Sequence, residues 1–88
     1  MSNFNYSNIE TAYEKIKHLL DKTPLISNDY INKLLDAKIY FKLENLQKTG
    51  SFKLRGATYK ISKLSEEQKL NGLVAYSSGN HAQAVAYA

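Results

Sequence analysis

Lys53 lies where a glycine-led turn leads into an amphipathic helix, and it is the side chain best suited to covalent chemistry in this chain. Gly50 allows the chain to reverse, and the hydroxyl of Ser51 can accept a hydrogen bond from an amide of the first helical turn. The positive end of the helix dipole disfavours an ammonium group there and favours a neutral amine. Because a neutral lysine attacks carbonyl groups, this position predicts a Schiff-base lysine.

A second turn, S-S-G-N-H at residues 77–81, has the composition of an anion-binding site. It follows a short apolar run, Leu73 to Tyr76, that is typical of a buried parallel strand, and it leads into another helix. Backbone amides at such a turn converge on an anion, and the side chains add hydroxyl, carboxamide and imidazole groups. In open α/β sheets ligands bind at the carboxyl ends of strands, and both turns are expected at such ends.

The elements that must position these turns form, by prediction, an α/β unit. Its order is strand, helix, strand, helix, with parallel strands and a right-handed crossover. Capping boxes at Ser7 and Ser65 each start a helix, and Thr23-Pro24 stops the first one. Helices are expected within residues 7–21, 27–35, 51–64, 65–72 and 80–88, and strands within residues 38–44, with one buried face, and 73–76.

Composition restricts the class of protein. The 88 residues, 43% hydrophobic and 23% charged, suffice for at most one small domain. Without cysteine there is no disulfide or thiolate metal site, and His18 has no second ligand at metal spacing, so no metal is expected. No leader sequence or membrane-length apolar run is recognisable, and we expect a cytoplasmic protein without a membrane partner. The last helix has no capping residue at Ala88, so the chain is interpreted as the front piece of something longer.

Three segments together resemble a known enzyme family. They are T-P-L at residues 23–25, K-L-E-N-L-Q-K-T-G-S-F-K-L-R-G-A at residues 42–57, and S-S-G-N-H-A-Q at residues 77–83. Their order and spacing are similar to those of the fold-type II pyridoxal-phosphate enzymes, in particular the threonine (serine) dehydratase and serine racemase group. The resemblance implies the tryptophan synthase β-like fold, with residues 1–45 starting its large domain and residues 46–88 starting its small α/β domain.

The resemblance also assigns roles to residues. In the family, the lysine of S-F-K-x-R-G-A holds pyridoxal 5′-phosphate as a Schiff base, and here it is Lys53. Phe52 matches the residue that packs near the cofactor ring. The S-S-G-N-H turn binds the substrate α-carboxylate, a role that falls to Ser77, Ser78, Gly79, Asn80 and His81. Asn80 would also bond the phenolic oxygen of the cofactor, and Ser78 would face the substrate opposite the lysine as a proton carrier. Arg55 is expected to cover a helix flank or to pair with a carboxylate.

The implied reaction is the dehydration and deamination of L-threonine, and of L-serine, to a 2-oxo acid and ammonia by a homo-oligomeric full-length enzyme. Lys53 would act as general base on the α-proton. Serine racemase is the alternative, and the residues do not separate the two, nor a catabolic from a biosynthetic dehydratase. Because the family's phosphate loop lies farther along the chain, the 88-residue piece is expected to have no turnover.

Two further hypotheses concern other ligands. A net charge of +4 with a pI of about 9.3 allows a basic nucleic-acid-binding module, but no nucleic-acid motif accompanies the lysines, so no nucleic-acid partner is expected. Some catabolic dehydratases of the family also bind an activating nucleotide between subunits, near the residues that match Lys48, Thr49 and Gln83. Such an effector would lower the apparent KM for threonine.

Overall fold

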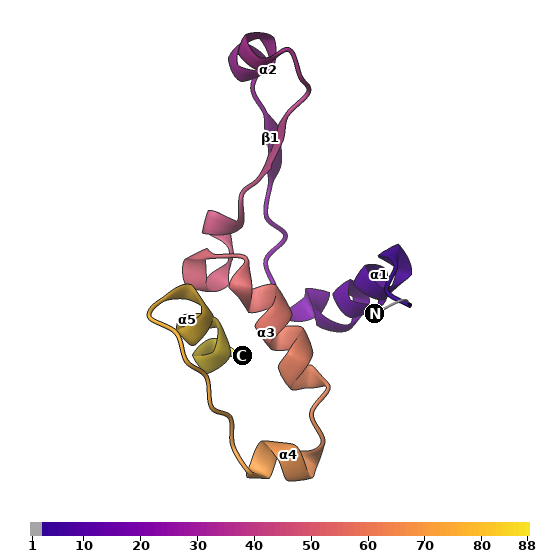
Figure 1. The fold of residues 1–88 in the computed structure, drawn as a ribbon, viewed down its shortest axis with the longest axis vertical. Helices are drawn as coiled ribbons and strands as arrows, with labels where there is room; N and C mark the ends of the chain where they lie inside the picture. Colours follow the sequence, from indigo (N-terminus) through magenta and orange to yellow (C-terminus); the bar gives the residue numbers. More distant parts are fainter. Residues whose placement is uncertain (1–2) are drawn as a thin grey trace.

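Helix α3, Lys53–Ser62, lies at the centre of the structure, and three extensions leave it in different directions (Figure 1). The computed structural model describes residues 3–88, which extend over 53 × 32 × 25 Å. Helix α1 packs against α3 near the N-terminus, a narrow hairpin rises at one end, and a loop that carries α4 closes the other. Helix α5, Asn80–Tyr87, lies beside α3 and also contacts the turn before it.

Helix α1, Tyr6–Ile16, is capped by Asn5, two residues before the predicted cap Ser7. The side chain of Asn5 accepts a hydrogen bond from the amide of Ser7 at 2.9 Å, and the side chain of Asn8 accepts one from the amide of Asn5 at 2.7 Å. The capping box is therefore built from two asparagines, because an Asn side chain can also accept an amide hydrogen bond at this position. A 3-10 turn, η1 (Lys17–Leu19), continues the helix toward Thr23-Pro24.

The hairpin corrects the predicted strand pairing. Strand β2, Tyr40–Lys42, lies within the predicted range, but it pairs antiparallel with β1, Leu25–Ser27. Helix α2, Asp29–Leu35, forms the tip, with Asn28 as the N-cap whose side chain accepts from the Ile31 amide. Both strands are exposed, so the predicted buried face is wrong: no second layer in residues 3–88 packs on this hairpin.

The segment after α3 contains one confirmed and one wrong prediction. Helix α4, Glu66–Leu70, begins at the predicted Ser65 capping box. Residues 73–76, in contrast, form no strand, and the side chains of Val74 and Tyr76 are fully exposed. Because a parallel strand needs hydrogen-bonding neighbours and covered faces, and no described element lies beside this run, the predicted parallel sheet and its crossover are absent from residues 3–88.

A small core joins α3 to α5. Leu54, Ala57 and Ala84 are buried together, and Leu20 and Val85 pack against them. The small side chains of Ala57 and Ala84 allow the two helices to approach closely. Within residues 3–88 the longest helix has 11 residues, and none is long and apolar enough to cross a bilayer. The expected division near residue 45 stays a prediction.

Candidate active site

The turn before Lys53 is tight and left-handed. It comprises two 3-10 turns, η2 (Glu44–Leu46) and η3 (Lys48–Gly50), and its last two residues, Thr49 and Gly50, have φ values of 66° and 76°. Glycine adopts this conformation freely, whereas for a β-branched threonine it is strained. The amide of Gly50 donates to the carbonyl of Gln47 at 2.8 Å, which closes the turn. The predicted chain reversal is confirmed.

Helix α3 begins at Lys53, one residue later than a helix capped by Ser51 would begin. The backbone N-cap is Phe52, which is helical and has no side-chain cap, but the hydroxyl of Ser51 still accepts a hydrogen bond from the amide of Lys53 at 3.4 Å. The Lys53 side chain is exposed, and its Nζ atom lies 5.3 Å from the centroid of the Phe52 ring. Lys53 makes no ion pair with any residue in 3–88, so its amine is accessible to a small molecule.

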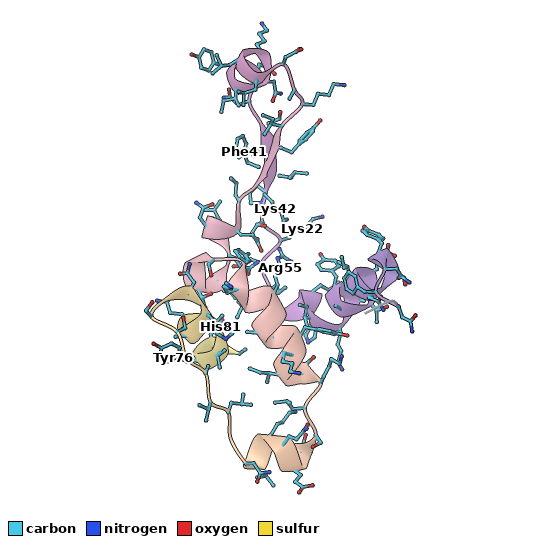
Figure 2. All side chains as sticks on the ribbon, viewed as in Figure 1. Lys22, Phe41, Lys42, Arg55, Tyr76 and His81 are labelled. Carbon is cyan, nitrogen blue, oxygen red and sulfur yellow. The ribbon has the colours of Figure 1, made fainter. Side chains whose placement is uncertain are left out.

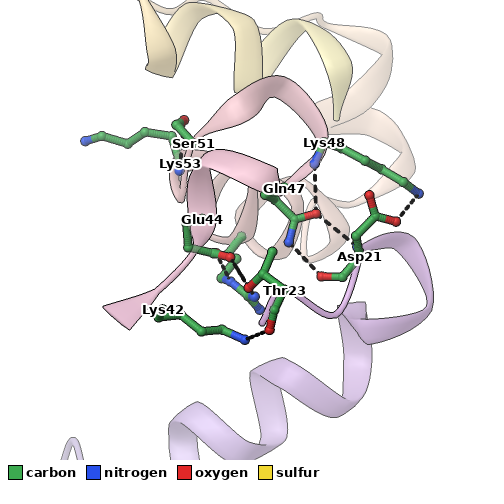
Figure 3. Close-up of polar contacts among 9 residues, drawn as sticks. Asp21, Thr23, Lys42, Glu44, Gln47, Lys48, Ser51 and Lys53 are labelled. Carbon is green, nitrogen blue, oxygen red and sulfur yellow. Dashed lines mark hydrogen bonds and ion pairs between the residues drawn. The ribbon is translucent and has the colours of Figure 1, made fainter. Parts of the chain in front are cut away.

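A partly buried polar cluster lies beside the lysine turn. The carboxylate of Glu44 accepts hydrogen bonds from Nε and Nη2 of Arg55, the latter at 3.2 Å, and from the hydroxyl of Thr23 at 2.6 Å (Figure 3). We call Thr23, Glu44 and Arg55 the clasp. Lys42 Nζ donates to the carbonyl of Thr23 at 2.7 Å. The hydrogen bond from Arg55 lowers the pKa of Glu44 although burial opposes it, and the same bond raises the pKa of Arg55.

Gln47 makes a second connection between the same segments. Its side chain is buried, with Oε1 accepting from the amides of Asp21 and Lys48 at 2.9 and 3.1 Å. Its Nε2 atom donates to the carbonyl of Asp21 at 2.8 Å. All three hydrogen bonds join the Gln47 side chain to backbone atoms. They satisfy backbone groups that would bond to other backbone groups in a regular helix or sheet.

The predicted anion-binding turn is open to solvent. The hydroxyl of Ser77 accepts a hydrogen bond from the amide of Gly79 at 3.2 Å, and α5 begins at Asn80, as predicted. Ser78, Gly79, Asn80 and His81 are exposed, and a Cβ atom placed on Gly79 would contact nothing within 4 Å. The turn therefore leaves room for a ligand in front of the first amides of α5.

Two of the three predicted effector residues meet. Thr49 and Gln83 line one open cavity of about 530 Å³ together with Ala86 and Tyr87. The Oγ1 atom of Thr49 is buried and has no hydrogen-bond partner in residues 3–88. Lys48 does not line this cavity; its Nζ atom lies 3.3 Å from the carbonyl of Leu19 and 4.0 Å from the carboxylate of Asp21. Thr49 and Gln83 thus line one cavity, whereas the Lys48 amine lies near Leu19 and Asp21.

The residues present suit the aldehyde end of pyridoxal phosphate. An accessible primary amine beside an aromatic ring can bind an aldehyde, and hydroxyls with helix-terminal amides can bind a carboxylate. A cavity of about 940 Å³ lies instead between α1 and α3 and is lined by residues such as Tyr13 and Tyr59, without Lys53. We assign the site from side-chain chemistry, because that cavity contains no reactive amine at a helix N-terminus. Residues 3–88 also contain no carboxylate or imidazole cluster that could hold a metal ion.

Sequence reasoning missed most of the polar cluster. It left Arg55 with the choice of a helix flank or a carboxylate partner, and the structure shows the partner to be Glu44. It gave no role to the side chains of Thr23, Glu44 and Gln47. The available signal was the three polar residues of E-N-L-Q, between a strand and a glycine turn, where buried polar side chains need partners.

Comparisons with known proteins agree on one family. The family model described as "Pyridoxal-phosphate dependent enzyme" matches residues 16–88. The chain is 48% identical to serine racemase of Dictyostelium discoideum over all of its residues, and these span 27% of that protein. It is 55% identical to a biosynthetic L-threonine dehydratase of Lactococcus lactis, covering 91% of the chain and 19% of the relative. The crystal structure of the Dictyostelium racemase superposes with a TM-score of 0.85 at 49% identity, over 92% of this chain and 26% of that one. The chain thus spans about a quarter or less of the length of these relatives.

Proposed function

The chain belongs to the pyridoxal-phosphate-dependent enzymes, close to threonine dehydratases and serine racemases, and we propose that the full-length protein deaminates L-threonine and L-serine to 2-oxo acids and ammonia. One observation carries this proposal. Lys53, with its accessible amine, is the first residue of α3, and α3 packs directly on α5, which begins within the S-S-G-N-H turn. The two segments on which the chemistry depends are therefore carried by neighbouring helices (Figure 2).

Lys53 would bind the aldehyde of pyridoxal phosphate, and Phe52 would lie against its ring. When bound, this group supplies an electron sink for the α-carbon of an amino acid. The Lys53 amine would also act as the general base that takes the α-proton of the substrate. The protein's contribution is then largely orientation of the scissile bond toward this amine.

The S-S-G-N-H turn would hold the substrate. Ser78 and Gly79 are exposed and Ser77 is half-buried. The amides and hydroxyls of this turn would suit the α-carboxylate, because a helix N-terminus favours an anion. Asn80 would contact the phenolic oxygen of the cofactor, and His81 would contribute its backbone amide more than its ring. Ser78 would carry a proton on the face opposite Lys53.

Serine racemase is the second candidate function. It is favoured by the similarity to the Dictyostelium racemase, both in sequence and in structure, whereas the Lactococcus relative favours the dehydratase. Both reactions begin with removal of the α-proton. They differ in the next step, which is loss of the β-hydroxyl in a dehydratase and reprotonation on the other face in a racemase.

Product analysis of the full-length protein separates these functions. The enzyme is incubated with L-threonine and with L-serine, and 2-oxo acid, ammonia and D-serine are measured. A dehydratase releases oxo acid and ammonia from both substrates, whereas a racemase converts L-serine mainly to D-serine. Absence of all three products would refute the proposal.

A further inference from the structure

The clasp holds α3 on the side opposite to Lys53. Successive residues of an α-helix are rotated by about 100°, so Lys53 and Arg55, two positions apart, point to nearly opposite sides. Figure 3 shows the Lys53 side chain projecting away from Glu44 and Thr23. Any rotation of the first turn of α3 about its axis would therefore move the lysine amine and the arginine together.

The bonding at Glu44 suits it to prevent such a rotation. Arg55 donates from two nitrogen atoms to the two oxygens of one carboxylate, and this planar, bidentate geometry fixes orientation as well as distance. Thr23 holds the same carboxylate from a third segment of the chain. The Glu44 and Arg55 side chains are only 13% and 29% exposed, so solvent screens the pair less than an ordinary surface ion pair.

Few interactions close to the start of α3 could prevent this rotation without the clasp. Phe52 gives α3 no side-chain cap, and the Ser51 hydroxyl bond to the Lys53 amide is long at 3.4 Å. The preceding Thr49 is in a strained left-handed conformation, which persists only where the surroundings hold it. The start of α3 is therefore fixed mainly by contacts from distant segments.

We propose that Glu44 is a positioning residue for Lys53, acting through Arg55 to set the direction in which the lysine amine leaves α3. This inference rests on the proposed function, because it concerns the amine assigned to the cofactor aldehyde. It gives a role in the reaction to Glu44, Arg55 and Thr23, which do not touch the reacting atoms.

The test measures how fast Lys53 binds the aldehyde. Full-length protein freed of cofactor is mixed with pyridoxal phosphate, borohydride is added at successive times, and the labelled Lys53 peptide is quantified by mass spectrometry. We expect Glu44→Gln to slow labelling about tenfold with the same final extent, since a misplacement of about 1 Å can cost up to ~10²-fold in rate. Arg55→Lys keeps the charge but loses the bidentate geometry, and it should slow labelling similarly.

The matched control is Glu66→Gln, which removes one carboxylate charge from the exposed pair with Lys69 on α4. It should label at the wild-type rate. In steady state, Glu44→Gln should lower kcat while KM changes by less than about twofold, as expected when orientation and not substrate binding is lost.

Each remaining outcome decides between the hypotheses. Labelling of Glu44→Gln at the wild-type rate, or equal slowing by Glu66→Gln, would overturn the positioning role. If circular dichroism shows that both Glu44→Gln and Arg55→Lys are unfolded, the clasp serves stability alone and the inference is again overturned. If the wild-type protein is not labelled at Lys53, the proposed function itself fails, which is distinguishable from failure of the clasp.

Discussion

The two turns of the candidate site differ in how the chain holds them. The lysine turn is bound by side chains from distant segments: Glu44 joins Thr23 to Arg55, and Gln47 reaches the backbone of Asp21. The S-S-G-N-H turn has one internal hydrogen bond, and the run before it exposes Tyr76 completely. The first turn is thus largely specified by contacts within residues 3–88, whereas the second needs neighbouring strands that these residues do not provide.

The largest expected effect is on kcat and follows from substitution of Lys53, the reactive side chain of the lysine turn. Lys53→Ala in the full-length enzyme should lower kcat by about 10³-fold or more, because both the covalent attachment and the general base are lost. Steady-state assays with L-threonine measure this. Lys60→Ala, an exposed lysine on the same helix, is the matched control and should leave kcat unchanged. Equal activity of the Lys53 variant and wild type would contradict the assignment.

The next largest effect is on stability and is expected in the core between α3 and α5. Leu54 is 1% exposed between α3 and α5, so Leu54→Ala should lower the free energy of unfolding by about 2–5 kcal/mol. Urea denaturation of the 88-residue chain, for which these exposures hold, measures it. Leu70 is 88% exposed, and Leu70→Ala should change the same quantity by less than about 0.5 kcal/mol. Similar losses in the two variants would show that the α3–α5 core does not hold the regions together.

The clasp predicts a smaller and pH-dependent effect. Glu44 faces Arg55 on α3, Lys42 on β2 and the Thr23 hydroxyl, and these partners lower its pKa in the folded state. Its contribution is therefore present above the ordinary carboxyl pKa of about 4.3 and is lost as the pH falls through the lowered value. At pH 7, Glu44→Gln should cost about 1–3 kcal/mol of unfolding free energy, and the difference from wild type should shrink in acid. A difference that grows on acidification would contradict the assigned pairing.

The smallest effect is expected in residues 73–76, the run before the S-S-G-N-H turn. The Val74 side chain is fully exposed, so Val74→Thr in the 88-residue chain should change its unfolding free energy by less than about 0.5 kcal/mol. Thermal unfolding followed by circular dichroism measures this. A larger loss would show that the run before the S-S-G-N-H turn is already packed within this chain and that the contrast between the two turns is wrong.

Local signals predicted the helices well. The Ser65 to Gln68 capping box, Thr23-Pro24 and the alanine-rich C-terminal segment each depend on residues within one or two turns, and α4, the end of the first helical segment and α5 are found where expected. Within α3, Leu54 and Ala57 are three positions apart, the spacing of residues on one helix face, and both are in the core. Such features require only neighbouring residues to form, so the sequence is sufficient to find them.

Strand pairing and polar partners could not be predicted in the same way. The alternation in residues 38–44 indicates a strand but not that Phe41 pairs with Ile26, and the apolar run at residues 73–76 cannot form a ladder without adjacent strands. The bond between Glu44 and Arg55 spans 11 residues, and that between Gln47 and Asp21 spans 26. Such partners are far apart in the sequence and can be identified only from the three-dimensional structure.

The identity of the residue that carries the cofactor tests the account most directly. The full-length protein is incubated with pyridoxal phosphate, reduced with borohydride, digested and mapped by mass spectrometry. We predict one modified peptide that contains the S-F-K-L-R-G-A motif, with the label on Lys53 and visible absorbance that is lost in Lys53→Ala. A label on another lysine, or no label at all, would contradict the central claim.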